Sequence, residues 1–220
     1  MSQTIKLSAA DGHSLDALTA LPAGQPRGGL VVIHDFMSFT PYLESVCAAY
    51  AAEGYAVAAP ALYDRQAPGA RFDRDPAAQQ QAASLRKGLQ WDEVMLDVDA
   101  ARVHLQAHGK CGIVGFCMGG SVVWLAASKP GFDAAISYYG KDVPDWLDKK
   151  PLCPVILHFG ENDALIPLDG VRATAAACPD VPVYTYAAGH AFDNPATGAS
   201  ADIVSLARKR SLDLLRQWIG

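Results

Sequence analysis

Polar and apolar positions alternate through the N-terminal part of the chain. The alternation falls into two short runs, residues 4–8 and 14–21, joined by Asp11-Gly12, a pair typical of a hairpin turn. From residue 29 the pattern changes to a continuous apolar run, GLVVIH, as expected of a strand buried on both faces of a parallel sheet. The pattern therefore predicts an antiparallel N-terminal hairpin followed by a buried strand.

Helical and strand-like segments alternate through the rest of the chain. Residues 42–53 have helical spacing and end before Gly54, a common residue at helix C-termini. Further strands are expected at residues 55–59, 111–115, 134–139, 155–160 and 183–187. Further helices are expected at residues 77–88, 91–108, 119–128, 169–177 and 201–219, the last with an apolar face of Ile203, Leu206, Leu212, Leu215 and Trp218. This alternation predicts an α/β fold with a doubly wound, mostly parallel sheet in one domain over residues 1–220.

The strongest chemical signal is a junction between a strand and a helix. Residues 113–127 read IVGFCMGGSVVWLAA, so an apolar strand runs through GFCMG directly into a helix. This is a G-x-nucleophile-x-G turn in which Cys117 stands where serine is more common. Side chains at the glycine positions would collide with neighbouring elements, and the positive end of the helix favours a thiolate. The alternative interpretation is that Cys117 is a buried core residue. An acid and a base that follow it in the order of a catalytic triad would argue against that alternative.

Two candidate partners follow Cys117 in the order nucleophile, acid, base that an α/β-hydrolase fold supplies. The strand PVILHFG is followed by END, whose last residue is Asp163, at the sheet edge where open α/β sheets bind ligands. A later strand leads into AGHAF, which contains His190. His158 competes as the base, but its place inside an apolar strand indicates a core histidine. We therefore predict a catalytic triad of Cys117, Asp163 and His190.

These residue types together indicate acyl chemistry. His190 is expected to take the thiol proton and later to activate water, while Asp163 holds the imidazole in one tautomer and stabilises its charged form. The oxyanion needs two backbone N–H donors, which we assign to Met118, next after the nucleophile, and to Phe36, after GLVVIH. The predicted reaction is hydrolysis of an ester or lactone through an acyl-enzyme thioester.

Composition and charge restrict the classes of partner. The chain has 220 residues, half of them hydrophobic, and a net charge of −5, which argues against nucleic acid or an anionic membrane. No apolar run approaches the ~18 residues of a membrane span, and the N-terminus lacks the pattern of a secretion signal. The five cysteines are scattered without CxxC spacing, so we expect free thiols, no metal site and a cytoplasmic location.

At these residues the chain resembles the dienelactone hydrolase family. The likeness extends over nearly the whole length, through VVIHDFMSFTPYLESVCAAYAAEGYAVAAPALYDR, GFCMGG, SYYG, HFGENDALIP and AAGHAF. The resemblance implies the single-domain α/β-hydrolase fold, no metal or organic cofactor, a small-molecule ester or lactone substrate and the same triad. It also implies that a carboxylate after the early strand modulates the resting thiol. Asp35 stands there, one methylene shorter than the glutamate that family members usually carry.

The anion-binding residues depart from the family pattern. Members that act on dienelactone hold the substrate carboxylate with two arginines, one of them four residues after the catalytic histidine, where this chain has Asn194. The other is expected within residues 77–83, which contain no arginine. Arg71, Arg74 or Arg86 could replace them. The departure predicts that neutral esters or lactones are better substrates than the anionic dienelactone.

Three aromatic residues are expected to line the substrate pocket beside Asn194, with a role in the core as the alternative for each: Phe39, Tyr139 and Phe192. Two other functions stay open. A redox sensor or binding protein could keep the fold and a reactive thiol without turnover, although sensing requires neither Asp163 nor His190. Transfer of the acyl group to an acceptor other than water is the second.

Overall fold

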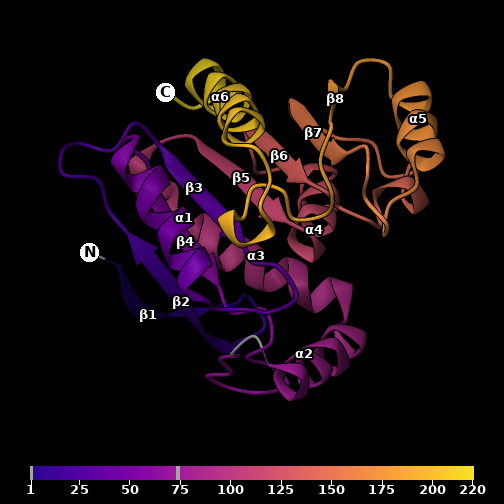
Figure 1. Cartoon of the computed structure of the whole chain (residues 1–220). Helices are drawn as coiled ribbons and strands as arrows, with labels where there is room; N and C mark the ends of the chain where they lie inside the picture. The colour runs from indigo at the N-terminus through magenta and orange to yellow at the C-terminus, as the bar shows by residue number, and fades with distance from the viewer. Residues whose placement is uncertain (1, 73–74) are drawn as a thin grey trace. The chain divides into compact units, whose positions relative to one another are not determined.

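The computed structural model describes residues 2–72 and 75–220 (Figure 1). The chain divides into two compact units, the first ending at residue 112 and the second beginning at residue 113. The described residues form eight strands, most of them parallel to their neighbours, and six α-helices. The fold is therefore of the predicted α/β class. No helix within the described residues is both long and apolar enough to cross a membrane.

The first unit, residues 1–112, contains the N-terminal hairpin. Its elements are β1 (Gln3–Ser8), β2 (Ser14–Ala20), β3 (Gly29–Ile33), α1 (Pro41–Ala52), β4 (Ala56–Pro60), α2 (Pro76–Gly88), α3 (Trp91–Leu105) and the 3-10 helix η1 (Gln106–His108). The strands lie in the order β1-β2-β4-β3, with the hairpin antiparallel, β2 antiparallel to β4, and β3 parallel to β4. Both α1 and α3 contact β4, all of whose residues are buried. The predicted hairpin and buried strand are confirmed.

The second unit begins within β5 (Cys111–Phe116) and continues to the C-terminus. Its elements are α4 (Met118–Ala127), β6 (Ala134–Tyr138), η2 (Val143–Asp145), β7 (Val155–Gly160), α5 (Leu168–Ala177), β8 (Val183–Tyr186), η3 (Pro195–Thr197) and α6 (Ala201–Trp218). The strands lie in the order β5-β6-β7-β8, and β7 is parallel to both β6 and β8. Because parallel strands end at the same edge, the loops that follow them gather there.

The apolar face predicted for the last helix is partly wrong. Leu206 and Trp218 are 43% and 38% exposed, whereas Ala207 and Ser211 of the same helix are fully buried. Ser211 is buried because its hydroxyl has polar partners in the core, which an apolar pattern does not reveal. The three 3-10 helices were also not predicted, because single turns of this kind have no period of their own.

A buried hydrogen-bond network joins α6 to the strands. His158 Nδ1 lies 2.8 Å from the Tyr186 hydroxyl, and its Nε2 lies 3.1 Å from Ser211 Oγ. The Tyr138 hydroxyl is 2.8 Å from the same Oγ, which donates to the Ala207 carbonyl at 3.0 Å. Burial lowers the pKa of His158 to about 3. His158 is thus a neutral core histidine with both ring nitrogens bonded, as its place in an apolar strand predicted.

Candidate active site

Cys117 occupies a strained turn between β5 and α4. Its φ of 55° and ψ of −115° place it in a region that residues with a Cβ rarely adopt, and its N–H donates to the Tyr138 carbonyl at 3.0 Å. A Cβ on Gly115 would lie 2.2 Å from the Gly119 carbonyl oxygen, so the chain can turn this sharply only if Gly115 has no side chain. The side chain of Cys117 is left partly exposed at the N-terminus of α4.

The loops that follow β7 and β8 are held side by side by backbone hydrogen bonds. The N–H groups of Glu161 and Asn162 donate to the carbonyls of Tyr186 and Ala188, at 2.7 and 3.0 Å. A Cβ on Gly160 would lie 2.4 Å from the Ala188 carbonyl oxygen, so the two backbones are in direct contact. This contact brings the residue after Asn162 within reach of the loop that carries His190.

Asp163 and His190 meet across these two loops. Asp163 Oδ2 lies 2.7 Å from His190 Nδ1, and its Oδ1 accepts the N–H of Leu165 at 2.8 Å. The side chain of Asp163 is fully buried, while that of His190 keeps 19% of its surface exposed. Both carboxylate oxygens therefore have donors, and one of them orients the imidazole.

The electrostatics of His190 depend on Asp163 and Cys117. Burial lowers the pKa of His190, but hydrogen bonding and charge from Asp163 and Cys117 outweigh it and raise the pKa to about 9. Nε2 is buried and makes no hydrogen bond of ordinary geometry within residues 2–72 and 75–220. Cys117 is nevertheless near enough to help raise the pKa of the imidazole. An imidazole anchored at Nδ1 and close to a thiol can exchange a proton with sulfur through Nε2.

Three of the residues assigned to the substrate pocket lie in the second unit and are buried. Tyr139 and Phe192 are each 1% exposed, and their rings meet at 5.5 Å between centroids. Asn194 is 5% exposed, and its Oδ1 accepts the N–H of Ala196 at 3.0 Å, which caps η3. The side-chain oxygen of Asn194 thus has a structural partner, and a role in binding substrate stays a prediction for all three.

The loop after β3 carries Asp35 and Phe36 and belongs to the first unit. Asp35 Oδ1 accepts the N–H of Met37 at 2.7 Å, and the Phe36 carbonyl accepts the Tyr63 hydroxyl at 2.9 Å. His34 Nε2 accepts the N–H of Leu62 at 3.2 Å, so Nδ1 carries the proton and donates to the Asp35 carbonyl at 2.6 Å. Burial lowers the pKa of His34, which stays neutral.

Sequence reasoning missed the roles of His34 and Tyr63 in holding this loop, because each bond joins segments about thirty residues apart. The assignments of Asp35 as a modulator of the thiol and of Phe36 as an oxyanion donor stay predictions.

The arginines suggested as replacements for the anion clamp differ in their settings. The Arg71 guanidinium lies 4.5 Å from the centre of the Phe39 ring, which is buried, and contacts Thr4 Oγ1 at 3.5 Å. Arg86 lies in the last turn of α2. Arg74 lies outside the described residues.

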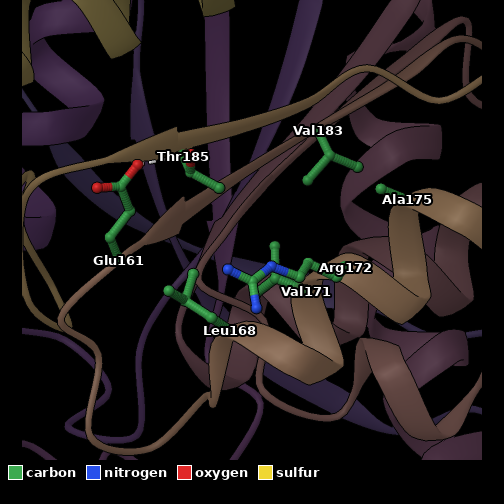
Figure 2. A pocket seen from close by; sticks show the side chains of 7 residues that line it. All are labelled: Glu161, Leu168, Val171, Arg172, Ala175, Val183 and Thr185. Atoms are coloured by element: carbon green, nitrogen blue, oxygen red, sulfur yellow. Dashed lines mark hydrogen bonds between the residues drawn. The ribbon is translucent and has the colours of Figure 1, made fainter.

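The second unit also has two cavities, one away from the predicted triad and one beside His190. One of about 420 Å³ lies between α5 and β8 and is lined by Glu161, Leu168, Val171, Arg172, Ala175, Val183 and Thr185 (Figure 2). Its polar groups already have partners, since Glu161 accepts the Thr185 hydroxyl at 2.9 Å and Arg172 contacts Asp169 at 3.0 Å. Another, of about 320 Å³, is lined in part by His190. No cluster of three or more His, Cys, Asp or Glu side chains in the described part of the chain is arranged to hold a metal ion.

Comparison with known proteins places the chain in a family. The sequence model of the dienelactone hydrolase family matches residues 15–219. A carboxymethylenebutenolidase of Pseudomonas putida is 31% identical over 227 residues, which cover 98% of this chain and 96% of the relative. The chain therefore belongs to the dienelactone hydrolase family, and it is an enzyme of the hydrolase class.

Solved structures agree on the fold. A crystal structure from Klebsiella pneumoniae aligns with a TM-score of 0.84 at 24% identity, covering 99% of this chain and 100% of the other. A dienelactone hydrolase-like promiscuous phosphotriesterase from metagenomic libraries aligns with a TM-score of 0.79 at 18% identity, covering 100% and 99%. The fold is thus the α/β-hydrolase fold that the sequence predicted.

Proposed function

We propose that the protein hydrolyses a neutral carboxylic ester or lactone, with Cys117 as nucleophile, His190 as general base and Asp163 as the residue that orients it. One observation carries this proposal. The imidazole of His190 is bound to Asp163 at 2.7 Å through Nδ1. Cys117, at the tip of a strained turn, helps to raise the pKa of the same imidazole. A nucleophile, a base and an orienting carboxylate in this order are the parts that acyl transfer requires.

The reaction follows from these positions. The Cys117 proton moves to His190 Nε2 while sulfur attacks the carbonyl carbon, and the charge on the carbonyl oxygen is stabilised by the N–H groups assigned to Met118 and Phe36. When the tetrahedral intermediate collapses, the C–O bond breaks and the leaving oxygen takes the proton from His190. Water then gives a proton to His190 and attacks the thioester, and the sulfur leaves and recovers a proton. In a lactone the leaving oxygen stays attached as a hydroxyl of the product.

The raised pKa of His190 suits the first half of this cycle. A pKa raised to about 9 by Asp163 and Cys117 makes the imidazole a stronger base, which favours transfer of the thiol proton to Nε2. The imidazolium then holds this proton until the leaving oxygen takes it.

Substitution of Cys117 tests the function. Cys117→Ala should lower the turnover of p-nitrophenyl acetate by at least ~10³-fold, because only binding and the oxyanion donors remain. Cys153→Ala is the matched control, because Cys153 is a half-buried cysteine outside the triad, and it should keep the wild-type rate. Mass spectrometry of the wild type should show an acetyl group on Cys117. Equal turnover by wild type and Cys117→Ala would refute the mechanism, and oxidation of Cys117 without any turnover would support the redox sensor instead.

A further inference from the structure

Four successive strands of the second unit each end beside a residue of the site. Cys117 follows β5, Tyr139 follows β6, and the loops after β7 and β8 carry Asp163 and His190. Neighbouring strands are about 4.8 Å apart, so the ends of β5 and β8 are separated by about 14 Å. The loop that carries His190 must therefore extend back across the ends of β7 and β6 to bring the imidazole near the sulfur. Tyr139 lies on that path.

Burial and backbone hydrogen bonds restrain Tyr139. It is 1% exposed, has a φ of 39°, and its N–H donates to the His158 carbonyl at 2.7 Å. The carbonyl of the preceding residue, Tyr138, accepts the N–H of Cys117 at 3.0 Å. The backbone around Tyr139 is thus connected both to the turn of the nucleophile and to β7.

The side chain of Tyr139 contacts the loop of His190 at three residues. Its ring centroid lies 4.9 Å from that of His190 and 5.5 Å from that of Phe192, and its hydroxyl donates to Asp193 Oδ1. Ala191, between them, has a φ of 57°, so the chain reverses immediately after the histidine. This reversal lets His190 and Asp193, three residues apart, reach the same tyrosine.

We propose that Tyr139 and Asp193 act together as a positioning clamp that holds the imidazole of His190 in line with the sulfur of Cys117. Asp163 restrains the ring at one nitrogen only, and a single hydrogen bond leaves the ring free to tilt about that bond. The Tyr139 ring restrains one side of the imidazole, and the Asp193 carboxylate holds the tyrosine hydroxyl and the loop together. Because displacement of a reacting group by about 1 Å can lower the rate about 10²-fold, this second restraint affects turnover. The clamp rests on the proposed function of the same site.

Paired variants test the clamp. Tyr139→Phe keeps the ring but loses the hydroxyl, and Asp193→Ala loses the acceptor, so each should lower kcat for p-nitrophenyl acetate by about 10–100-fold and change KM by less than about 3-fold. Asp193→Asn retains an oxygen that accepts the hydroxyl proton and should stay within about 3-fold of the wild type. The double variant Tyr139→Phe/Asp193→Ala should be no worse than the poorer single variant, because the two residues act as one unit.

A second readout separates positioning from folding. Alkylation of Cys117 by iodoacetamide, followed by mass spectrometry across pH 5–9, should shift its pH profile in Tyr139→Phe and Asp193→Ala and not in Asp193→Asn. Tyr186→Phe is the matched control, since it also loses a buried tyrosine hydroxyl, here bonded to His158, and it should lower the Tm without changing the profile. If Tyr139→Phe fails to fold, the comparison of Asp193→Ala with Asp193→Asn tests the clamp: a lower kcat and a shifted profile in Asp193→Ala alone support it, and equal behaviour of the two variants contradicts it.

The outcomes distinguish the clamp from the function on which it rests. Wild-type kcat and an unchanged alkylation profile in both Tyr139→Phe and Asp193→Ala, in a protein whose wild type forms acyl-Cys117, would overturn the clamp alone. Additive losses in the double variant would also overturn it, since they would mean independent contributions. Absence of acyl-Cys117 in the wild type would instead overturn the proposed function.

Discussion

At the scale of single residues, the site depends on backbone conformations that most residues avoid. Cys117, Tyr139 and Ala191 all have positive φ, at 55°, 39° and 57°, and all three are part of the site or adjacent to it. Each such conformation costs about 1–3 kcal/mol and persists only where surrounding contacts hold it. The glycine two residues before the nucleophile allows one of these conformations, because its missing side chain leaves room for the carbonyl of Gly119.

Gly115→Ala should therefore destabilise the protein strongly. The new Cβ would lie 2.2 Å from the Gly119 carbonyl oxygen, and neither backbone can move without displacing the turn of Cys117. We expect a loss of about 3 kcal/mol or more in the free energy of unfolding, measured by urea denaturation, together with loss of esterase activity. Gly170→Ala is the control, since its Cβ would meet Pro144 at an ordinary 3.6 Å in helix α5 and should be neutral or stabilising. Similar stabilities for the two variants would contradict this account of the turn.

At the scale of elements, α6 is attached to β6, β7 and β8 by polar as well as apolar contacts. Arg210 donates to the Tyr186 hydroxyl at 3.1 Å, so that hydroxyl can give its own proton to His158 Nδ1, and Nε2–H donates to Ser211. A second proton on His158 would oppose the hydroxyl proton of Tyr186 and add charge near Arg210. The network is therefore complete only when His158 is neutral.

The attachment of α6 should weaken in mild acid. The pKa of His158 is about 3 in the folded protein against an ordinary 6.5, so the unfolded chain binds the extra proton first, and stability falls as pH drops below 6.5. This residue should account for about 2 kcal/mol of lost unfolding free energy between pH 7 and pH 5. Urea unfolding of wild type and His158→Gln measures it: the variant should be less stable at pH 7 but lose less on acidification. If the unfolding free energies of wild type and His158→Gln fell in parallel with pH, His158 would not be the source of the acid sensitivity.

At the scale of the whole molecule, the chain belongs to the dienelactone hydrolase family but lacks arginine at the two places where the anion clamp was expected. Asn194 in the second unit caps η3 with its side-chain oxygen, and residues 77–83 in the first unit contain no arginine. A hydrogen bond to a charged group contributes about 1.5–3 kcal/mol, so without two such partners we expect most of the preference for a carboxylate to be lost. The family model nevertheless extends over both units.

We expect a neutral short-chain ester to have at least about a 10-fold higher kcat/KM than its carboxylate analogue. Asn194→Arg should move this ratio toward the anion, and Asn194→Ala, which loses the same cap without adding charge, shows how much of any change comes from the cap. A strong preference of the wild type for the carboxylate would contradict the prediction and would indicate that another arginine, such as Arg71, binds it.

The amino-acid sequence by itself determined the α/β class, the order of the strands and helices, and the candidate nucleophile, acid and base. These depend on local signals: the spacing of apolar residues, glycines on both sides of Cys117, and acid and histidine residues placed just after strands. His158 could be set aside as a base for the same reason, because it lies within an apolar run.

Only the tertiary structure decided the features that depend on contacts between distant segments. The 2.7 Å bond between Asp163 and His190 requires β7 and β8 to be neighbours, and the bond from Tyr139 to Asp193 requires the histidine loop to return across β6. The burial of Ser211 and the exposure of Trp218 likewise follow from which partners α6 meets. The spacing of apolar residues indicates which helix or strand a residue belongs to. Hydrogen-bond partners in the core depend instead on how the fold brings separate elements together.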